Sequence, residues 1–254
     1  MFFDHRNYDY LTLLLIRISL LSFQTIFMRF TDCGTLLFCS FCIFLLSCSK
    51  ELRPAANECG AYIAPGVWKE FQCYNLGASN TSADPFTPGW EIIGGYWRWG
   101  GTAMAVAGPA GPDATVANDG AAGGWINSPA PNGSWSDDVK TSLDPCPAGY
   151  RVPSNTEWDG VIANNIQSSV GTDWTNSATN YSTGRKFGSK LFLPTAGDRY
   201  NVNGTLFGRG YHGYYWSSTV NGSLDAWLLY FDSGHAGTYS ISRVYGQSVR
   251  CIAE

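Results

Sequence analysis

The chain has 254 residues and a formal net charge of −4, with 16 Lys and Arg against 20 Asp and Glu. Because 44% of the residues are hydrophobic and only 14% are charged, the chain can bury a core, and this composition excludes an intrinsically disordered protein. No basic run is present, so no nucleic-acid partner is expected. The 29 glycines and 10 tryptophans, without heptad repeats, indicate a loop-rich domain with short strands rather than a helical bundle.

An apolar run of 13 residues over 35–47 ends in Leu45-Leu46-Ser47-Cys48. It is too short to span a bilayer of about 30 Å comfortably, but it suits the core of a signal peptide. Its end resembles the lipobox of bacterial lipoproteins, in which the cysteine after the cleavage site carries the lipid. We therefore expect an over-extended start over 1–27, a lipoprotein signal peptide over 28–47, a tether over 48–58 lipidated at Cys48, and a binding domain over 59–254.

This organisation places the protein on the outer membrane, held there only by its lipid anchor. Residues 11–21 are also apolar, and a second hydrophobic anchor there is the alternative to an over-extended start. The three residues directly after Cys48, Ser49-Lys50-Glu51, contain one acid, whereas export signals to the cell surface are rich in acids just after the cysteine. The expected location is therefore either the cell surface or the periplasmic face.

Four cysteines follow the tether, an even number that predicts two disulfides in an exported chain. Three pairings are compatible with the sequence, which does not choose among them. We favour Cys59 with Cys73, which closes a short loop, and Cys146 with Cys251, which ties the first half of the domain to its last strand.

Short strands are predicted over 67–73 and 94–100, and a long Gly-, Ala- and Pro-rich loop follows them. A helix is predicted after Pro153, because Ser154 and Glu157 form a capping box ahead of apolar residues at helical spacing. Those residues are Trp158, Val161, Ile162 and Ile166. Further strands are predicted over 191–194, 214–218, 226–232 and 248–252. One capped helix followed by a small antiparallel sheet predicts the α+β class.

Several motifs together resemble the Fibrobacter succinogenes major paralogous domain over residues 67–252. They are Val67-Trp68, Asn75-Leu76-Gly77-Ala78, GGYWRWG at 94–100, DPCPAGYRVPSNTEW at 144–158, GYYWSST at 213–219 and SVRCI at 248–252. The resemblance implies a domain with the C-type-lectin-like fold, which that family shares with the formylglycine-generating enzymes. It also supports the Cys146–Cys251 pair, since that fold typically ties the start of a helix to the last strand. The family's activity is largely unassigned, so the resemblance implies a fold more than a function.

Catalysis and metal binding are both disfavoured by the residues. Formylglycine-generating enzymes use a reactive cysteine pair, whereas Cys146 and Cys251 are better assigned to a structural bridge. The chain has no Gly-x-Ser-x-Gly nucleophile motif, no Cys-x-x-Cys for zinc and no carboxylate-rich calcium motif. We therefore expect no enzyme activity, no metal and no cofactor.

Aromatic residues offer a binding surface that needs no metal, because Trp and Tyr faces stack on ligands at low entropic cost. Trp97, Trp99, Tyr211, Tyr214 and Trp216 are candidates. The alternative is that the tryptophans belong to the core, which we favour for Trp158, Trp216 and Trp227, so that tyrosines in turns are the better binding candidates. The segment Ala226–Asp232 alternates, so that Trp227, Leu229 and Phe231 are expected in the core and Leu228, Tyr230 and Asp232 on the surface. The predicted ligand-binding residues are Tyr214, Asn221, Ser223, Asp225, Leu228, Tyr230, Asp232, His235, Tyr239, Ser242 and Tyr245.

The C-terminal region also resembles the variable region of receptors that retroelements diversify, many of which are lipoproteins. In such systems mutagenesis directed at adenines turns Asn-type codons into codons for Tyr, Asp, His, Ser, Gly, Ile, Leu or Val. Most of the positions that we expect on the surface of this region hold one of these residues. Taken together, the sequence predicts a non-catalytic lipoprotein that binds a glycan or a protein through its C-terminal loops and strand faces. The alternatives are a formylglycine-type enzyme and a structural adhesin subunit.

Overall fold

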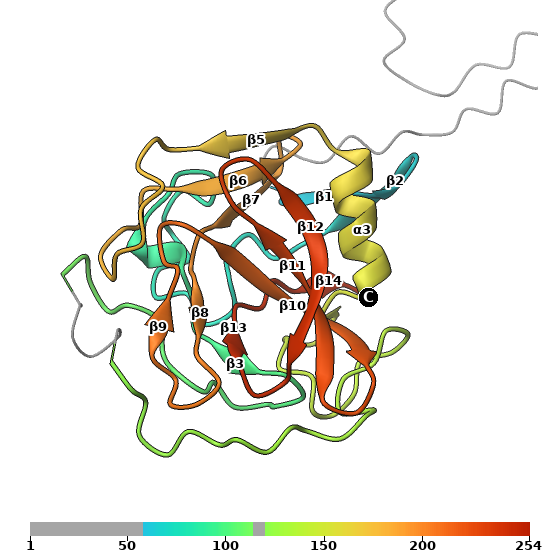
Figure 1. Ribbon diagram of the computed structural model, residues 1–254. Helices are drawn as coiled ribbons and strands as arrows, with labels where there is room; N and C mark the ends of the chain where they lie inside the picture. The colour runs from blue at the N-terminus through green and yellow to red at the C-terminus, as the bar shows by residue number, and fades with distance from the viewer. Residues whose placement is uncertain (1–57, 114–119) are drawn as a thin grey trace, which may run out of the picture. The chain divides into compact units, whose positions relative to one another are not determined.

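The computed structural model describes residues 58–113 and 120–254 (Figure 1). The expected start, the signal peptide, Cys48 and nearly all of the tether lie outside the described residues. The described residues all belong to the unit Leu52–Glu254. None of their helices is long and apolar enough to cross a membrane.

Fourteen β-strands, one α-helix and one 3-10 turn are formed by the described residues. In chain order they are β1 (Gly60–Ala64), β2 (Val67–Glu70), η1 (Trp90–Ile92), β3 (Trp97–Arg98), β4 (Tyr150–Arg151), α3 (Asn155–Asn164), β5 (Gln167–Val170), β6 (Gly184–Phe187), β7 (Leu191–Pro194), β8 (Asp198–Arg199), β9 (Leu206–Phe207), β10 (Gly213–Asn221), β11 (Asp225–Phe231), β12 (Ala236–Ser242), β13 (Gly246–Gln247) and β14 (Ile252–Ala253).

The strands pair in five small sheets, in the orders β1-β2, β3-β13-β8-β9, β14-β4, β5-β6-β7 and β10-β11-β12. All strand pairs in these sheets are antiparallel. The described part of the chain is therefore mostly β, and the expected α+β class, a C-type-lectin-like domain with one small sheet, is wrong. The polar segments at 167–170 and 236–242 form strands by pairing with neighbours, although their own sequences lack hydrophobic alternation.

The capped helix is confirmed as α3. The Ser154 side chain accepts a hydrogen bond from the Glu157 backbone N–H at 3.2 Å, and Glu157 accepts one from the Ser154 backbone at 2.8 Å. Trp158 and Val161 are fully buried, as their spacing predicts. Ile166 lies beyond the helix, which ends at Asn164, and its side chain is 89% exposed.

The β10-β11-β12 sheet has a hydrophobic cluster against each of its faces. Tyr215, Leu229 and Phe231 pack with Trp158 of α3 on one face. Trp216 and Leu228 pack on the other face with tryptophans from the first half of the chain, among them Trp97, Trp99 and Trp135. Leu228 is therefore only 2% exposed, and its expected place on the surface is wrong because this second cluster covers its face.

Both expected disulfides are present, Cys59–Cys73 and Cys146–Cys251. The first closes the segment around β1 and β2, and the second joins the segment before β4 to the residue before β14. Cys146 and Cys251 are themselves members of the second hydrophobic cluster, so this bridge passes through the core.

Candidate functional site

The candidate site lies where the second hydrophobic cluster ends on the β10-β11-β12 sheet. Alternation along the strands places Tyr214 and Tyr230, a cross-strand pair, on the same face as Trp216 and Leu228. Trp216 and Leu228 are buried, whereas Tyr214 and Tyr230 are only partly buried at the edge of the cluster. The partly buried rings of Tyr214 and Tyr230 therefore support an aromatic surface at this end of the sheet.

Seven side chains form this surface, which we call the aromatic cluster. They are Phe207, Tyr211, His212, Tyr214, Tyr230, His235 and Tyr239, linked by ring-centroid distances between 4.1 and 6.4 Å. Phe207 and Tyr239 are each 50% exposed and Tyr211 is 41% exposed. The cluster thus offers half-exposed rings to a ligand.

His212 lies at the centre of the cluster. Its ring centroid is 4.1 Å from that of Tyr211 and 5.3 Å from that of Tyr230. The Tyr214 hydroxyl lies 3.1 Å from His212 Nδ1. Burial lowers the pKa of His212, although the charge of Asp232 partly opposes this effect, so the imidazole is neutral at pH 7.

A tight turn over residues 208–212 presents Tyr211 and His212. The His212 backbone N–H donates to the Gly208 carbonyl at 2.7 Å. Gly210 has φ of 77°, and a Cβ there would lie only 2.4 Å from Asn180 atoms, so the turn requires glycine at this position. The buried Arg209 stabilises the turn, because its guanidinium donates a hydrogen bond to the Ala178 carbonyl at 2.6 Å.

Asp232 supplies a carboxylate at the border of the aromatic cluster. Its oxygens accept hydrogen bonds from the Gly234 and His235 backbone N–H groups, both at 2.8 Å, and from the Tyr230 hydroxyl at 2.9 Å. Burial alone would raise the pKa of Asp232, but these hydrogen bonds outweigh it, so the pKa lies below its ordinary value. The carboxylate is therefore ionised and held in a fixed orientation.

The hydroxyls of Tyr214 and Tyr230 stay protonated. Burial raises the pKa of Tyr230, and its hydrogen bond to Asp232 adds to the rise. Burial also raises the pKa of Tyr214, together with the charge of the nearby Asp198. The aromatic cluster thus presents rings and hydroxyls beside the fixed carboxylate of Asp232, a combination suited to stacking and hydrogen bonding rather than to nucleophilic chemistry.

The structure divides the predicted ligand-binding residues into two groups. Tyr214, Tyr230, His235 and Tyr239 belong to the aromatic cluster, and Asp232 contacts it. Tyr245 belongs to neither group, because its ring packs against Tyr200 with centroids 5.6 Å apart and its backbone N–H donates to the Ser242 carbonyl at 3.1 Å. The residues Asn221, Ser223, Asp225 and Ser242 lie at the opposite end of the sheet, around the β10–β11 turn. Because Tyr214 and Asn221 are seven positions apart in β10, the two groups are separated by roughly 20 Å and do not form one site.

Among the earlier aromatic candidates, Trp97, Trp99 and Trp216 are buried and only Tyr211 and Tyr214 join the cluster. Sequence reasoning missed Phe207 and His212. A signal for His212 was available in the aromatic run from Tyr211 to Trp216, whereas Phe207 comes from β9, whose place beside this run depends on tertiary packing.

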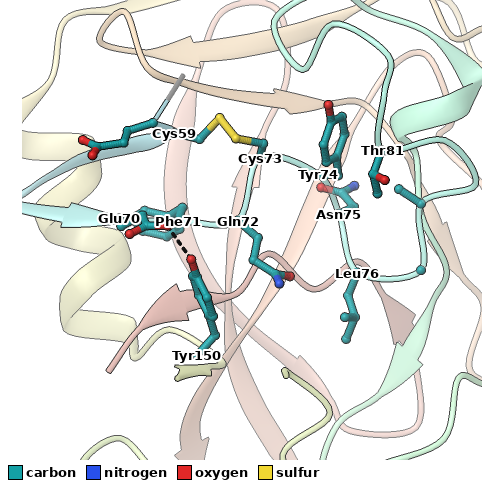
Figure 2. A pocket seen from close by; sticks show the side chains of 13 residues that line it. Cys59, Glu70, Phe71, Gln72, Cys73, Tyr74, Asn75, Leu76, Thr81 and Tyr150 are labelled. Atoms are coloured by element: carbon teal, nitrogen blue, oxygen red, sulfur yellow. Dashed lines mark hydrogen bonds between the residues drawn. A yellow bond between two sulfur atoms is a disulfide. The ribbon is translucent and has the colours of Figure 1, made fainter. Parts of the chain in front are cut away.

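A pocket of about 430 Å³ lies outside the aromatic cluster, beside the Cys59–Cys73 disulfide (Figure 2). Most of its polar groups already serve the fold. The Tyr150 hydroxyl donates to Glu70, and this bond is the main reason that the pKa of Tyr150 rises to about 12. The Asn75 amide donates to the Ile93 carbonyl and to the Tyr215 hydroxyl. We therefore regard the aromatic cluster as the stronger candidate site.

Comparison with known proteins gave one match. A family model described as Domain of unknown function (DUF8237) matches residues 189–252, which is 64 of the 254 residues. The matched segment contains every residue of the aromatic cluster. No curated protein and no solved structure matched the chain. Within the described residues, no group of three or more His, Cys, Asp or Glu side chains could hold a metal ion.

Proposed function

We propose that this protein is a non-catalytic binding protein of the cell envelope, and that its ligand, a glycan or a protein, binds to the aromatic cluster. One observation carries the proposal: Phe207, Tyr211 and Tyr239 hold half-exposed rings against the supporting rings of His212 and Tyr230. Rings that are ordered before binding offer a large contact area at a small entropic cost, as tyrosines do in antibody paratopes.

Binding is favoured over cysteine-based catalysis because Cys59, Cys73, Cys146 and Cys251, the described cysteines, are all engaged in disulfides. A formylglycine-type mechanism needs a reactive thiol, and the described residues hold none. Thiol titration of the folded protein tests this part of the proposal. A reactive thiol at any of these four positions would contradict it.

The experiment for ligand binding compares two probes, a glycan array and a phage-displayed library of random twelve-residue peptides. The test variant is Tyr211→Ala combined with Tyr239→Ala, and the matched control is Tyr62→Ala, a 38% exposed tyrosine in β1 outside the aromatic cluster. We expect the double substitution to weaken binding about tenfold or more, since exposed aromatic anchors carry much of the energy of such surfaces. Binding that survives the double substitution, or no binding to either probe, would contradict the proposal.

Anchoring through lipid at Cys48 in the outer membrane is also part of the proposal. The apolar run that ends at Cys48 supports it. Growing cells with an alkyne analogue of palmitate should label the wild-type chain and the Cys42→Ser control, but not the Cys48→Ser variant. Equal labelling of the Cys48→Ser variant would contradict lipidation at this cysteine.

Diversification of the ligand surface is a further part of the proposal. The positions expected to vary lie in or beside the aromatic cluster, and they are Tyr230, Asp232, His235 and Tyr239. Phe231 is fully buried, so we expect it to stay constant. Sequencing the 3′ end of the gene across a host population should find substitutions concentrated at the first four codons. An even, low substitution rate over the region would leave a receptor of fixed specificity.

A further inference from the structure

The outer edge of β12 is open, whereas the opposite edge of its sheet is covered. On β10, the Trp216 backbone N–H donates to the Ser248 carbonyl at 3.0 Å, and the Ser218 N–H donates to the Pro153 carbonyl at 2.8 Å. β12 is the last strand in the order β10-β11-β12, and none of its residues is buried. Figure 1 shows it as the outer strand in front of this sheet. Of the two edges of this sheet, the edge at β12 is therefore the one that can pair with a further strand.

The register identifies the backbone groups that are open. The Arg243 N–H donates to the Leu224 carbonyl and the Asp232 N–H donates to the His235 carbonyl, both at 3.0 Å. These two bonds fix the alternation of the β11–β12 ladder, so the N–H and C=O groups of Ala236, Thr238 and Ser240 point away from β11. Within the described residues, these outward groups form no hydrogen bond.

β12 lacks the features that normally protect an edge strand from pairing. Its sequence, AGTYSIS, contains no charge and no proline, and its seven residues pair with β11 without a register shift. Two other outer strands in the described chain differ. β2 carries Lys69 and Glu70, and β5 has only four residues. An unprotected edge of this length is the structural requirement for accepting an added strand.

The open edge is continuous with the aromatic cluster, because Tyr239 belongs to both. Tyr239 lies in the middle of β12, and its ring packs on Tyr230 and His235. A strand paired with β12 would place every second side chain on the same face as Tyr239, beside the rings of the cluster. Backbone pairing and ring contacts would then act on the same ligand.

A carboxylate beside β12 indicates the charge of the segment that would pair with this strand. Asp159 is exposed beside β12, where it accepts a hydrogen bond from the Thr238 hydroxyl at 2.7 Å, and its other oxygen accepts one from Asn155 at 3.0 Å. Self-pairing of two copies about Thr238 would bring two Asp159 carboxylates together, which is unfavourable. A foreign segment with a Lys or Arg opposite Thr238 would instead place a cation next to this carboxylate.

We propose that β12 binds an extended, basic segment of a protein ligand as a fourth strand of the β10-β11-β12 sheet, with alternate side chains on the aromatic cluster. This inference rests on the proposed function and narrows the ligand from a glycan or a protein to a protein. Its hydrogen bonds go to the backbone groups of Ala236, Thr238 and Ser240.

The experiment uses the full chain in detergent micelles and a synthetic peptide selected from the random library. Amide hydrogen exchange should slow at Ala236, Thr238 and Ser240 when the peptide is added, and methylation of alternate peptide nitrogens should weaken binding about tenfold. Thr238→Pro should weaken binding similarly, because this position donates nothing to β11 and tolerates proline. Thr238→Val is the matched control, since it keeps the N–H and removes only the hydroxyl. Asp159→Asn should reduce the dependence of the affinity on salt.

The outcomes separate this inference from the proposed function. Peptides that require Tyr211 and Tyr239 but leave the three amides unprotected would overturn strand addition and leave the binding surface intact. Binding of glycans alone would do the same. Protection of these amides that depends on protein concentration without peptide would overturn the inference in favour of a second copy of this chain. No binding to the aromatic cluster by any probe would overturn both.

Discussion

The Arg250 guanidinium donates two hydrogen bonds to the side-chain oxygen of Asn75, from Nε at 3.1 Å and from Nη2 at 2.7 Å. Nη1 of the same group donates to the Phe192 carbonyl at 3.1 Å. Arg250 and Asn75 are both 1% exposed and lie 175 positions apart in the chain. This contact joins two of the sequence motifs, Asn75-Leu76-Gly77-Ala78 and SVRCI, in the interior of the domain.

Replacing Arg250 should therefore destabilise the fold strongly. Arg250→Lys leaves the Asn75 oxygen and at least one carbonyl without their donors, and we expect a loss of about 3 kcal/mol or more in the free energy of unfolding. Urea unfolding with the disulfides intact measures this loss. The matched control is Arg98→Lys, at a partly exposed position with a hydrogen bond to the Ile126 carbonyl, which should cost less than about 1 kcal/mol. Equal effects of the two substitutions would contradict this assignment.

Local interactions made some elements predictable from the sequence. The capping box of α3 involves two residues three positions apart, Ser154 and Glu157. It can therefore be predicted from the local sequence, without knowledge of tertiary contacts. β10 and β11 are rich in aromatic and aliphatic residues and were predicted for that reason. β12 was missed because its Gly, Ser and Thr residues form a strand only through pairing with β11.

The candidate site was only partly predictable for a related reason. The alternation of β11 correctly separates its two faces, but it does not reveal that tryptophans from the first half of the chain cover Leu228. Likewise, Tyr230 and Asp225 were equally good surface candidates in the sequence. Their places at opposite ends of the strand decide that only Tyr230 joins the aromatic cluster.

The stability of the fold should fall as the pH rises towards neutral, because of Asp198. Burial is the main cause that raises its pKa from 3.8 to about 7, although Gln247 and the charge of Arg199 partly oppose the rise. The folded state therefore holds a proton that the unfolded state releases between these two pH values. The contribution is fully present below about pH 4 and is lost by about pH 7, with a total on the order of 4 kcal/mol.

Asp198→Asn removes this titration. We expect the variant to gain stability relative to the wild type as the pH rises from 5 to 8, measured by urea unfolding at each pH. Asp138→Asn, the same substitution at an exposed position, is the matched control and is measured over the same pH range. Using the difference between variant and wild type cancels the contribution of His212, whose lowered pKa destabilises the fold in acid. A constant difference across this range would contradict the role of Asp198.

The two disulfides should contribute unequally to stability. Cys146–Cys251 spans 105 positions and Cys59–Cys73 spans 14. In the chain-entropy model, the longer loop gives roughly 1.5–2 kcal/mol more stabilisation, because closing it removes more freedom from the unfolded chain. Urea unfolding of the two double-alanine variants measures the difference. A larger loss from the Cys59–Cys73 pair would contradict the model.

Glu157 should matter far more than its partner in the capping box. It accepts hydrogen bonds from Arg151 at 2.7 and 2.8 Å as well as from the Ser154 backbone, and Glu157 and Arg151 are both buried. Glu157→Ala leaves the Arg151 guanidinium without its counter-charge and should cost about 3–5 kcal/mol. Ser154→Ala removes the cap and the hydrogen bond from the Ser154 hydroxyl to Glu157 Oε2 at 3.1 Å, but it leaves the Arg151–Glu157 pair in place and should cost about 1 kcal/mol.

A double-mutant cycle separates the ion pair from the cap. Once Arg151 is replaced by methionine, Glu157→Ala should cost at least about 1 kcal/mol less than it does in the wild type, because the buried cation is no longer left unpaired. The Ser154 hydroxyl accepts from the Glu157 backbone N–H at 3.2 Å and donates to Glu157 Oε2 at 3.1 Å, and it makes no hydrogen bond to Arg151. The cost of Ser154→Ala should therefore change less between the two backgrounds than the cost of Glu157→Ala. Additive effects for Glu157 and Arg151 would show that the salt bridge contributes nothing beyond the cap.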